Sequence, residues 1–513
     1  MVSNSVSFQT TDSLVQAVYN AAEDKARHNL VQFAGRRVLI EGGEYPNLWL
    51  ETQPMGGEMY AKRDPEAAYN NIDLFMRAAD SKGMMPGMIS YIDGVYREHH
   101  NFIQGYCFPV HALNLYYLLN LDRDYLLRLY EALRRYDAWL WASRESDGDG
   151  CLEAWCPCDT GEDYASKFFG APHFWESRNP PHSHEYHFPR ASMDLMGYSY
   201  DGRRTLAQVS ALLGNGEEAY WSAQAEEIKR KIRSYLWREE RHACFDRDEN
   251  GAWLEILTHN NLRVMYHGAF SQEMADDFIR YHLVNPEEFW TPMPLPSTAV
   301  NDPLFRNIPE NNWSGQPEGL TYQRTIRALE NYRHHAEIPL LGNHLLRAIG
   351  TEGFFSQQFD PFTGEISRKN NPTGDYGPTL LACLEYISRM YGVHRQFDEI
   401  WWGAYHGGHD CSYTQRYGET TCCIGQRGGQ AEGFVNGVSV FRVSAGCRVE
   451  TTLAGKVLRV TNISAGAQIQ RLETEGKCIS QLLEPNQALV RTASGDFAPD
   501  RSVPFTLPEP ERA

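Results

Sequence analysis

The chain has 513 residues, of which 42% are hydrophobic and 12% aromatic, enough for a large buried core and not typical of disorder. Its 48 basic and 66 acidic residues give a net charge of −18. An acidic surface of this size repels phosphate backbones and anionic headgroups, so neither nucleic acid nor a membrane surface is an expected partner.

The opening residues, MVSNSVSFQTTDSLVQ, lack the basic stretch and the apolar run of a secretory signal. No segment approaches the roughly 20 apolar residues that a membrane helix requires. The eleven cysteines are an odd number scattered along the chain, so we expect most of them to be reduced and buried. These features predict a cytoplasmic protein, and a chain trimmed of its signal would look the same.

Amphipathic helices separated by long loops rich in Gly, Pro and aromatic residues dominate the chain up to about residue 400. Asp64, Pro65 and Glu66 supply an N-cap, a first-turn proline and a first-turn acid. Apolar residues recur at helical spacing between Leu121 and Trp141. We predict helices that begin near Thr11, Asp64, Phe108, Arg123, Pro189, Glu217, Gln272, Pro317, Ala336 and Pro378.

Ten or more helices with little sheet indicate either a closed toroid of paired helices or a helical solenoid. A solenoid would show a fixed repeat of roughly 34 to 47 residues, and no such repeat stands out. The sequence therefore favours the toroid, with a mainly α fold.

The composition changes after Trp401, Trp402 and Gly403, where short segments mostly rich in β-branched residues alternate with glycine-containing turns. We predict strands over Val438–Val443, Cys447–Leu453, Lys456–Ile463 and Gln468–Glu473. The chain is thus divided into a helical domain, residues 1–403, and a small antiparallel β domain or appendage, residues 404–513. We assign no chemistry to the β domain.

Two loops that precede predicted helices combine an aromatic residue, an acid and an amide. One contains Trp49, Glu51 and Gln53, and the other contains Trp313, Gln316 and Glu318. Aromatic rings stack on the C–H faces of sugars, while carboxylates and amides bind hydroxyls, so the loops are typical of a sugar pocket. The alternative is that each tryptophan only covers the core.

Acids crowd around Gly161, with Asp159 on one side and Glu162 and Asp163 on the other. Mutual repulsion and partial burial raise a carboxyl pKa toward the range of a general acid. A solvated acidic turn is the alternative. Nearby, Asp147 to Gly150 resembles part of a calcium loop but lacks the glutamate that should follow, and we interpret it as a turn.

We expect no metal and no cofactor. Cys156 with Cys158, and Cys422 with Cys423, lack a second matched pair of ligands for zinc. A proline-rich loop that carries His173, His182, His184 and His187 is interpreted as structural. No nucleotide-binding motif or nucleophile-elbow motif is present.

The order of several segments resembles glycoside hydrolases of the (α/α)6 clan that holds trehalases, the processing α-glucosidases of family 63 and mannosylglycerate hydrolases. Landmarks of that clan run from Asn47 to Glu365, well over half the chain. They are Asn47 to Gln53, Asp64-Pro65-Glu66, Lys82 to Met88, Asp147 to Leu152, Asp159 to Lys167, Met193 to Met196, Asn312 to Glu318 and Phe355 to Glu365. The resemblance implies an (α/α)6 toroid.

In that clan the Asp that matches Asp163 is the general acid. The general base is a Glu, and its position here holds Gln357. The chain also departs at Ser314 and Gln316, where the clan carries Arg and Pro. Because an amide cannot take a proton from water at neutral pH, we choose Glu318 as the base.

The sequence thus predicts an inverting glycoside hydrolase that cleaves a terminal sugar from a small glycoside or oligosaccharide. Asp163 and Glu318 are the predicted catalytic residues. The predicted binding residues are Trp49, Glu51, Gln53, Glu162, Trp313, Gln316 and Gln357. A glycoside phosphorylase or sugar lyase on the same toroid, or a sugar-binding protein with reduced catalysis, are the alternatives. The oligomeric state stays open.

Overall fold

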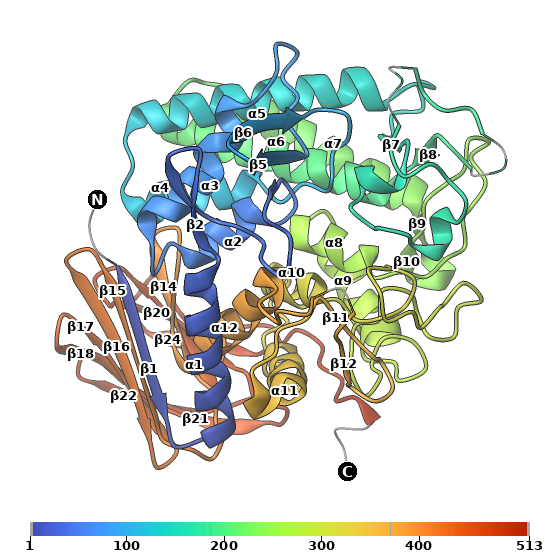
Figure 1. Ribbon diagram of the computed structural model, residues 1–513. Coiled ribbons are helices and arrows are strands. Elements are labelled where there is room, and N and C mark those ends of the chain that lie inside the picture. Colours follow the sequence, from blue (N-terminus) through green and yellow to red (C-terminus); the bar gives the residue numbers. More distant parts are fainter. Residues whose placement is uncertain are drawn as a thin grey trace.

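The structure is a computed structural model that describes residues 4–175, 177, 179–183, 185, 187–369 and 371–509. A helical body forms one side of the molecule, and strands from the C-terminal part of the chain form the other (Figure 1). Within the described part of the chain, no helix is both long and apolar enough to cross a membrane.

The described residues contain twelve α-helices, and ten of them begin within four residues of a predicted start. They are α1 (Ser13–His28), α2 (Gln53–Tyr60), α3 (Pro65–Arg77), α4 (Pro109–Leu119), α5 (Arg123–Arg144), α6 (Met193–Leu213), α7 (Glu218–Lys231), α8 (Asn260–His267), α9 (Gln272–Phe278), α10 (Gly319–Glu330), α11 (Glu337–Ile349) and α12 (Gly377–Tyr391).

Six helices form a closed series of contacts around a common centre. The helix α2 contacts α4, α4 contacts α6, α6 contacts α8, α8 contacts α10, α10 contacts α12, and α12 returns to α2. Other helices pack against this series, with α3 on α2, α5 and α7 on α6, and α1 and α11 on α12. All residues of α2 and α8 are buried, whereas α7 buries only three side chains.

The sequence analysis missed α2 and α8. Both have only eight residues, and burial on every side removes the alternation of polar and apolar faces that marks a surface helix. The segment of α2, QPMGGEMY, also contains two glycines, which lower helix propensity.

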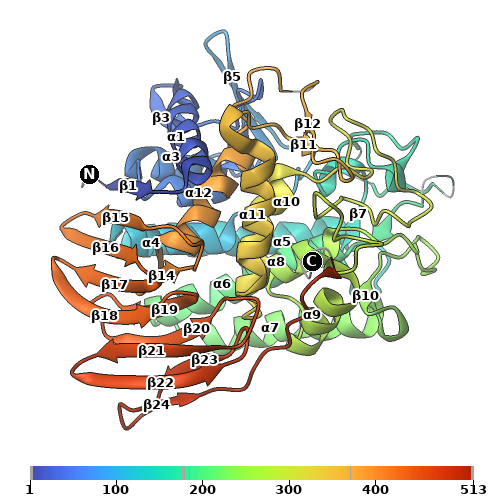
Figure 2. The same ribbon diagram turned by 90° about the horizontal axis from the view of Figure 1, so that it is seen from below.

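Two antiparallel sheets make up the β-rich region (Figure 2). The seven-stranded sheet runs β1 (Ser5–Thr10), β15 (Cys411–Tyr417), β16 (Thr420–Arg427), β17 (Gln430–Val435), β18 (Val438–Ser444), β21 (Gln468–Thr474) and β22 (Lys477–Leu483). The six-stranded sheet runs β13 (Val393–Gln396), β14 (Glu399–Ala404), β19 (Cys447–Thr452), β20 (Val457–Asn462), β23 (Ala488–Arg491) and β24 (Phe497–Pro499). Trp402 of β14 packs edge-to-face on Phe441 of β18, which joins the two sheets.

The predicted β-rich C-terminal region is confirmed, and all four predicted strands are present as β18 to β21. The strands β15 to β17 were not predicted, because Gln, Cys and Gly separate their β-branched and aromatic residues. Apart from β1, the strands of these two sheets begin at Val393. The strand β1, from the start of the chain, joins the larger sheet. The division at residue 403 stays a prediction.

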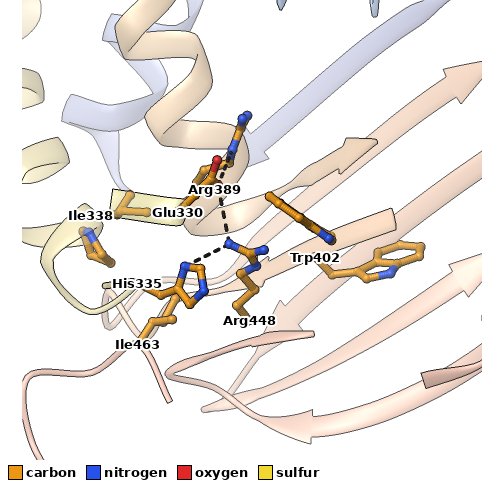
Figure 3. Close-up of a pocket in the computed structure, with 10 residues that line it drawn as sticks. Glu330, His335, Ile338, Arg389, Trp402, Arg448 and Ile463 are labelled. Atoms are coloured by element: carbon orange, nitrogen blue, oxygen red, sulfur yellow. Dashed lines mark hydrogen bonds and ion pairs between the residues drawn. The ribbon is translucent and has the colours of Figure 1, made fainter. Parts of the chain in front are cut away.

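A buried polar cluster joins the helical body to the sheets (Figure 3). The side chain of Arg448 on β19 lies 3.4 Å from the carboxylate of Glu330 and donates to Nδ1 of His335 at 3.0 Å. Arg389 on α12 pairs with the same Glu330 at 3.1 Å, and the guanidinium of Arg448 lies 3.7 Å from the ring centre of Trp401. These contacts hold the sheets against α10 and α12, away from the cavity described next.

Candidate active site

A cavity of about 70 Å³ lies at one end of the six-helix series. Apart from Leu320 in α10, the residues around it belong to segments that lead into α2, α4, α6, α10 or α12. They are Glu41, Tyr45, Trp49, Glu51, Gln104, Gly161, Asp163, Asn311, Trp313, Leu320, Gln357 and Tyr376. The cavity therefore brings together loops that are far apart in the sequence.

Asp163 presents a carboxyl group to this cavity, and its side chain is 21% exposed. Nδ2 of Asn311 donates a hydrogen bond to Oδ2 of Asp163 at 2.9 Å, and Nε2 of His173 lies 3.4 Å from Oδ1. Burial raises the pKa of Asp163 above its usual range, against the lowering effects of Asn311 and His173. A carboxyl group that keeps its proton near neutral pH can act as a general acid.

A chain of hydrogen bonds runs from Asp163 through Asn311 to two other residues of the cavity lining. Nε2 of Gln357 donates to Oδ1 of Asn311 at 2.9 Å, and the hydroxyl of Tyr45 donates to Oε1 of Gln357 at 3.1 Å. Both ends of the Gln357 amide are therefore engaged, so its orientation is fixed.

Glu51 also lines the cavity and is held by an ion pair. Nη2 of Arg324 lies 2.6 Å from Oε1 of Glu51. Gly161 has a left-handed backbone conformation and lies against the Glu51 carboxylate. A Cβ at position 161 would lie 2.6 Å from the same oxygen, so glycine allows the two residues to approach each other. Glu51 is thus a fixed carboxylate suited to accepting hydrogen bonds from sugar hydroxyls.

Two predicted carboxylates are absent from the described cavity lining. Glu162 pairs with Nζ of Lys167 at 2.6 Å and accepts from Nδ2 of Asn260 at 2.8 Å. Burial alone would raise its pKa, but the nearby cations, led by Lys167, hold that pKa well below its usual range. Glu162 thus serves as an internal anchor of the loop that carries Asp163.

Glu318 is the N-cap residue of α10 and is fully buried. Nε2 of Gln358 donates to Oε1 of Glu318 at 2.7 Å, whereas Oε2 has no hydrogen-bond partner among the described residues. Burial raises the pKa of Glu318 well above its usual range. The carboxyl is absent from the described lining of the cavity, although Asp163 and Glu51 are among the charged groups that act on it, and its catalytic role stays a prediction.

Trp49 and Trp313 line the cavity, as predicted. The amides of Gln53 and Gln316 are absent from the described lining. Oε1 of Gln53 accepts from the backbone N–H of Trp49 at 2.6 Å and so holds that loop. Gln316 accepts a hydrogen bond from Ser367. The indole N–H of Trp49 has no partner among the described residues, so a ligand hydroxyl is a natural acceptor for it.

The sequence analysis did not single out several polar lining residues, namely Glu41, Tyr45, Gln104, Asn311 and Tyr376. Weak signals were present, since Glu41 precedes two adjacent glycines and Asn311 directly precedes the segment that matched a clan motif. Which of these residues reach one cavity depends on how the helices close on each other, and no local pattern carries that information.

Three side chains near the cavity have metal-ligand chemistry. One ligand atom each of Cys158, Asp163 and His173 lies within 4.8 Å of the others. The pair Cys422 and Cys423 is different, because successive residues of the strand β16 point to opposite faces of the sheet. These two neighbours therefore cannot bind one ion together.

Of the other histidines in the proline-rich loop, His182 and His187 belong to the described residues, and neither lines the cavity. His182 is exposed, and His184 is outside the described residues. Nδ1 of His187 lies 3.9 Å from a carboxylate oxygen of Asp248 and 3.7 Å from one of Glu249.

Comparison with known proteins identifies the helical body. A family model described as "Mannosylglycerate hydrolase MGH1-like glycoside hydrolase domain" matches residues 57–379. No curated protein sequence gives a significant match.

Similar solved structures share the fold at low sequence identity. A family 63 mannosylglycerate hydrolase from Thermus thermophilus, in complex with glucose, is 17% identical with a TM-score of 0.56, over 72% of this chain and 99% of its own. The neutral trehalase of Saccharomyces cerevisiae is 15% identical with a TM-score of 0.52, over 69% and 74%. A sialidase is 14% identical with a TM-score of 0.66, over 87% of this chain and 41% of its own.

The family match covers more than half of the chain and includes Asp163, Trp313 and Gln357 of the cavity. The suspected clan is therefore confirmed. The chain belongs to the mannosylglycerate hydrolase MGH1-like glycoside hydrolase family, and it is a glycoside hydrolase.

Proposed function

We propose that the enzyme is an inverting hydrolase that releases a terminal sugar from a small neutral glycoside or oligosaccharide. We further assign to its helical body an (α/α)6 toroid, with the active site at the mouth of the inner ring. The closed series of contacts from α2 to α12 supports this assignment, as does the position of the cavity at the ends of those helices.

The observation that carries the proposal is the environment of Asp163. Its carboxyl is reachable from the cavity, is fixed by Asn311, and has a pKa raised by burial. Those are the requirements for a general acid that protonates the glycosidic oxygen as the bond to the anomeric carbon breaks.

The size and lining of the cavity support a single sugar ring as the bound unit. The 70 Å³ is roughly five to seven times the minimum of about 10 to 15 Å³ that a cavity needs to hold one water. Trp49 and Trp313 supply apolar surfaces for the C–H faces of a sugar, and Glu51 and Gln357 supply hydrogen-bonding groups.

The charges of the lining support a neutral substrate. Among the described residues that line the cavity, three are acids and none is Lys or Arg. The structural neighbours include a mannosylglycerate hydrolase and a sialidase, whose names imply anionic substrates. No Lys or Arg of the described lining would neutralise a carboxylate or phosphate group, which also disfavours the phosphorylase alternative.

An inverting mechanism needs a second carboxylate about 6.5 to 9.5 Å from the acid, to activate the water. Glu318 stays the sequence-based candidate for this role. Its Oε2 has no hydrogen-bond partner among the described residues, which favours the role, whereas its full burial disfavours it. We also infer a cytoplasmic enzyme, supported by eleven cysteines that are all free thiols.

A product analysis tests the function. The purified enzyme is incubated with a panel of disaccharides and aryl glycosides, with and without phosphate, and NMR follows the first anomer released. We expect phosphate-independent release of a free sugar whose anomeric configuration is opposite to that of the substrate. Release of a sugar phosphate, of an unsaturated product, or of the retained anomer would contradict the proposal.

A further inference from the structure

Glu41 is a carboxyl group of the cavity that lies outside the family match. It follows β3 (Arg36–Leu39) and precedes α2, whereas the match begins at residue 57. Its residue surface is 8% exposed, and it lines the same cavity as Asp163. The family motifs therefore give no information about its role.

The backbone holds Glu41 in a fixed place. The N–H of Gly377, at the start of α12, donates to the carbonyl of Glu41 at 2.6 Å. Gly42 has a φ of +75°, and a Cβ at that position would lie 2.3 Å from Nδ2 of Asn29 and 2.5 Å from the carbonyl of Asp375. This turn is thus tied to the loop before α12, and only glycine fits there.

No cation neutralises the Glu41 carboxyl among the described residues. The charged groups that act on it are the carboxylates of Glu51 and Asp163, and its hydrogen-bond partner is the hydroxyl of Tyr376. Burial raises the pKa of Glu41 well above its usual range, and the two neighbouring negative charges add to that effect. A buried, unpaired carboxyl is costly to keep, and such groups concentrate at catalytic sites.

We propose that Glu41 is the general base of this enzyme. This inference rests on the proposed inverting hydrolysis. In the ionised form of Glu41, a water between its carboxylate and the sugar loses a proton to that carboxylate as the water oxygen bonds to the anomeric carbon. The bond from that carbon to the leaving oxygen breaks at the same time, and the leaving oxygen takes the proton of Asp163. Exchange of protons with solvent then restores both carboxyls.

The other carboxyls near the cavity fit the role less well. Burial raises the pKa of Glu51, but the ion pair with Arg324 opposes that effect and holds its carboxylate in place. Glu318 is fully buried and is absent from the described lining. The amide of Gln357, at the family's base position, cannot accept a proton at neutral pH, and both of its ends are engaged by Tyr45 and Asn311.

Three variants with the same Glu→Gln change test the assignment, namely Glu41→Gln, Glu318→Gln and Glu44→Gln. Glu44 is exposed in the same turn and serves as the matched control. The substrate is the glycoside that the wild type hydrolyses fastest, together with its 2,4-dinitrophenyl analogue. We expect Glu41→Gln to lower kcat by about 10²- to 10⁴-fold on both substrates. Glu44→Gln should match the wild type, and Glu318→Gln should lose less than Glu41→Gln.

Two further measurements separate a base from a residue that only supports the fold. Azide should restore turnover of the dinitrophenyl glycoside by Glu41→Gln, giving a glycosyl azide of inverted configuration. In Glu41→Asp, the plot of kcat against pH should still fall at acidic pH, although its maximum should be lower than in the wild type. In Glu41→Gln, the fall at acidic pH should disappear. Circular dichroism and the melting temperature show whether each variant folds.

The two proposals fail in different ways. If the wild type hydrolyses with inversion and Glu41→Gln keeps more than a tenth of the wild-type kcat, Glu41 is not the base and the hydrolase stands. If Glu41→Gln does not fold, a Glu41→Asp enzyme with wild-type kcat and pH profile overturns the assignment. If the wild type retains configuration or forms a sugar phosphate, the proposed function fails and the role of Glu41 falls with it.

Discussion

The amide of Asn311 donates a hydrogen bond of 2.9 Å to Oδ2 of Asp163, across 148 positions of sequence. This bond favours the ionised form of a carboxyl whose pKa is raised by burial. Asn311 thus lowers the pKa of the group that we expect to donate the catalytic proton.

Replacement of Asn311 by Ala should therefore shift the pH dependence of hydrolysis. With Asp163 as the proposed general acid, we expect activity to require its protonated form and to be lost as the pH rises through the pKa of that residue. Since the hydrogen bond from Asn311 lowers this pKa, its removal should move the basic limb of the kcat/KM profile to higher pH. A basic limb that moves to lower pH would contradict the role of Asn311. The exposed Asn250→Ala is a suitable control.

Replacement of Asp163 by Asn should lower kcat by about 10²- to 10⁴-fold on an unactivated glycoside. The loss should be much smaller on a 2,4-dinitrophenyl glycoside, because that leaving group departs without a proton. Glu162→Gln should instead lower the melting temperature, since it breaks the ion pair with Lys167. Equal losses on both substrates would remove Asp163 from the role of general acid.

Zinc ions should inhibit the enzyme, and a chelator alone should not. Cys158, Asp163 and His173 together offer three ligand atoms, and a carboxylate binds a metal ion only after it loses its proton. A bound Zn²⁺ would thus remove the catalytic proton. EDTA should reverse the inhibition, and His173→Gln should weaken it. Magnesium should have no effect, because a thiolate and an imidazole are poor ligands for it. Loss of activity in EDTA would contradict this prediction.

Replacement of Arg448 by Met should destabilise the contact between the helical body and the sheets. Arg448 is buried and binds Glu330 and Glu450, at 3.4 and 3.1 Å. Removing one partner of a buried ion pair costs about 3 to 5 kcal/mol, measured here as the free energy of unfolding in urea. Arg471→Met is the control, because the pair of Arg471 with Glu473 is exposed and solvent screens it. A loss from Arg448→Met no larger than that of the control would show that the cluster is dispensable.

The sequence predicted those parts of the fold that local chemistry determines. Asp64 caps α3 through a 3.0 Å bond to the N–H of Ala67, as the Asp-Pro-Glu pattern indicated. The cluster of acids around Gly161 also led to Asp163 in the cavity. In both cases the determining residues are neighbours in sequence.

The part of the cavity lining that contains Glu41 and Tyr376 could not be predicted in this way. Glu41 and Tyr376 meet there although more than 300 positions separate them in the sequence, and neither lies in a recognisable motif. Glu318 shows the same limit, since its acid-and-aromatic loop predicts a catalytic role, while its side chain accepts a hydrogen bond from Gln358 and is absent from the described cavity lining. Burial and side-chain direction depend on packing that spans the whole helical body.

The pairing of β1 with β15 has a consequence for how the protein is made. Thr10 faces Cys411 in this ladder, so the first strand of the chain has no partner until about 400 more residues have left the ribosome. At roughly 5 to 20 residues per second, that delay is about 20 to 80 s. During this time Ser5–Thr10 is an unpaired strand edge, open to wrong partners. Translation speed and chaperone supply should therefore affect the yield of this enzyme more than its final stability would indicate.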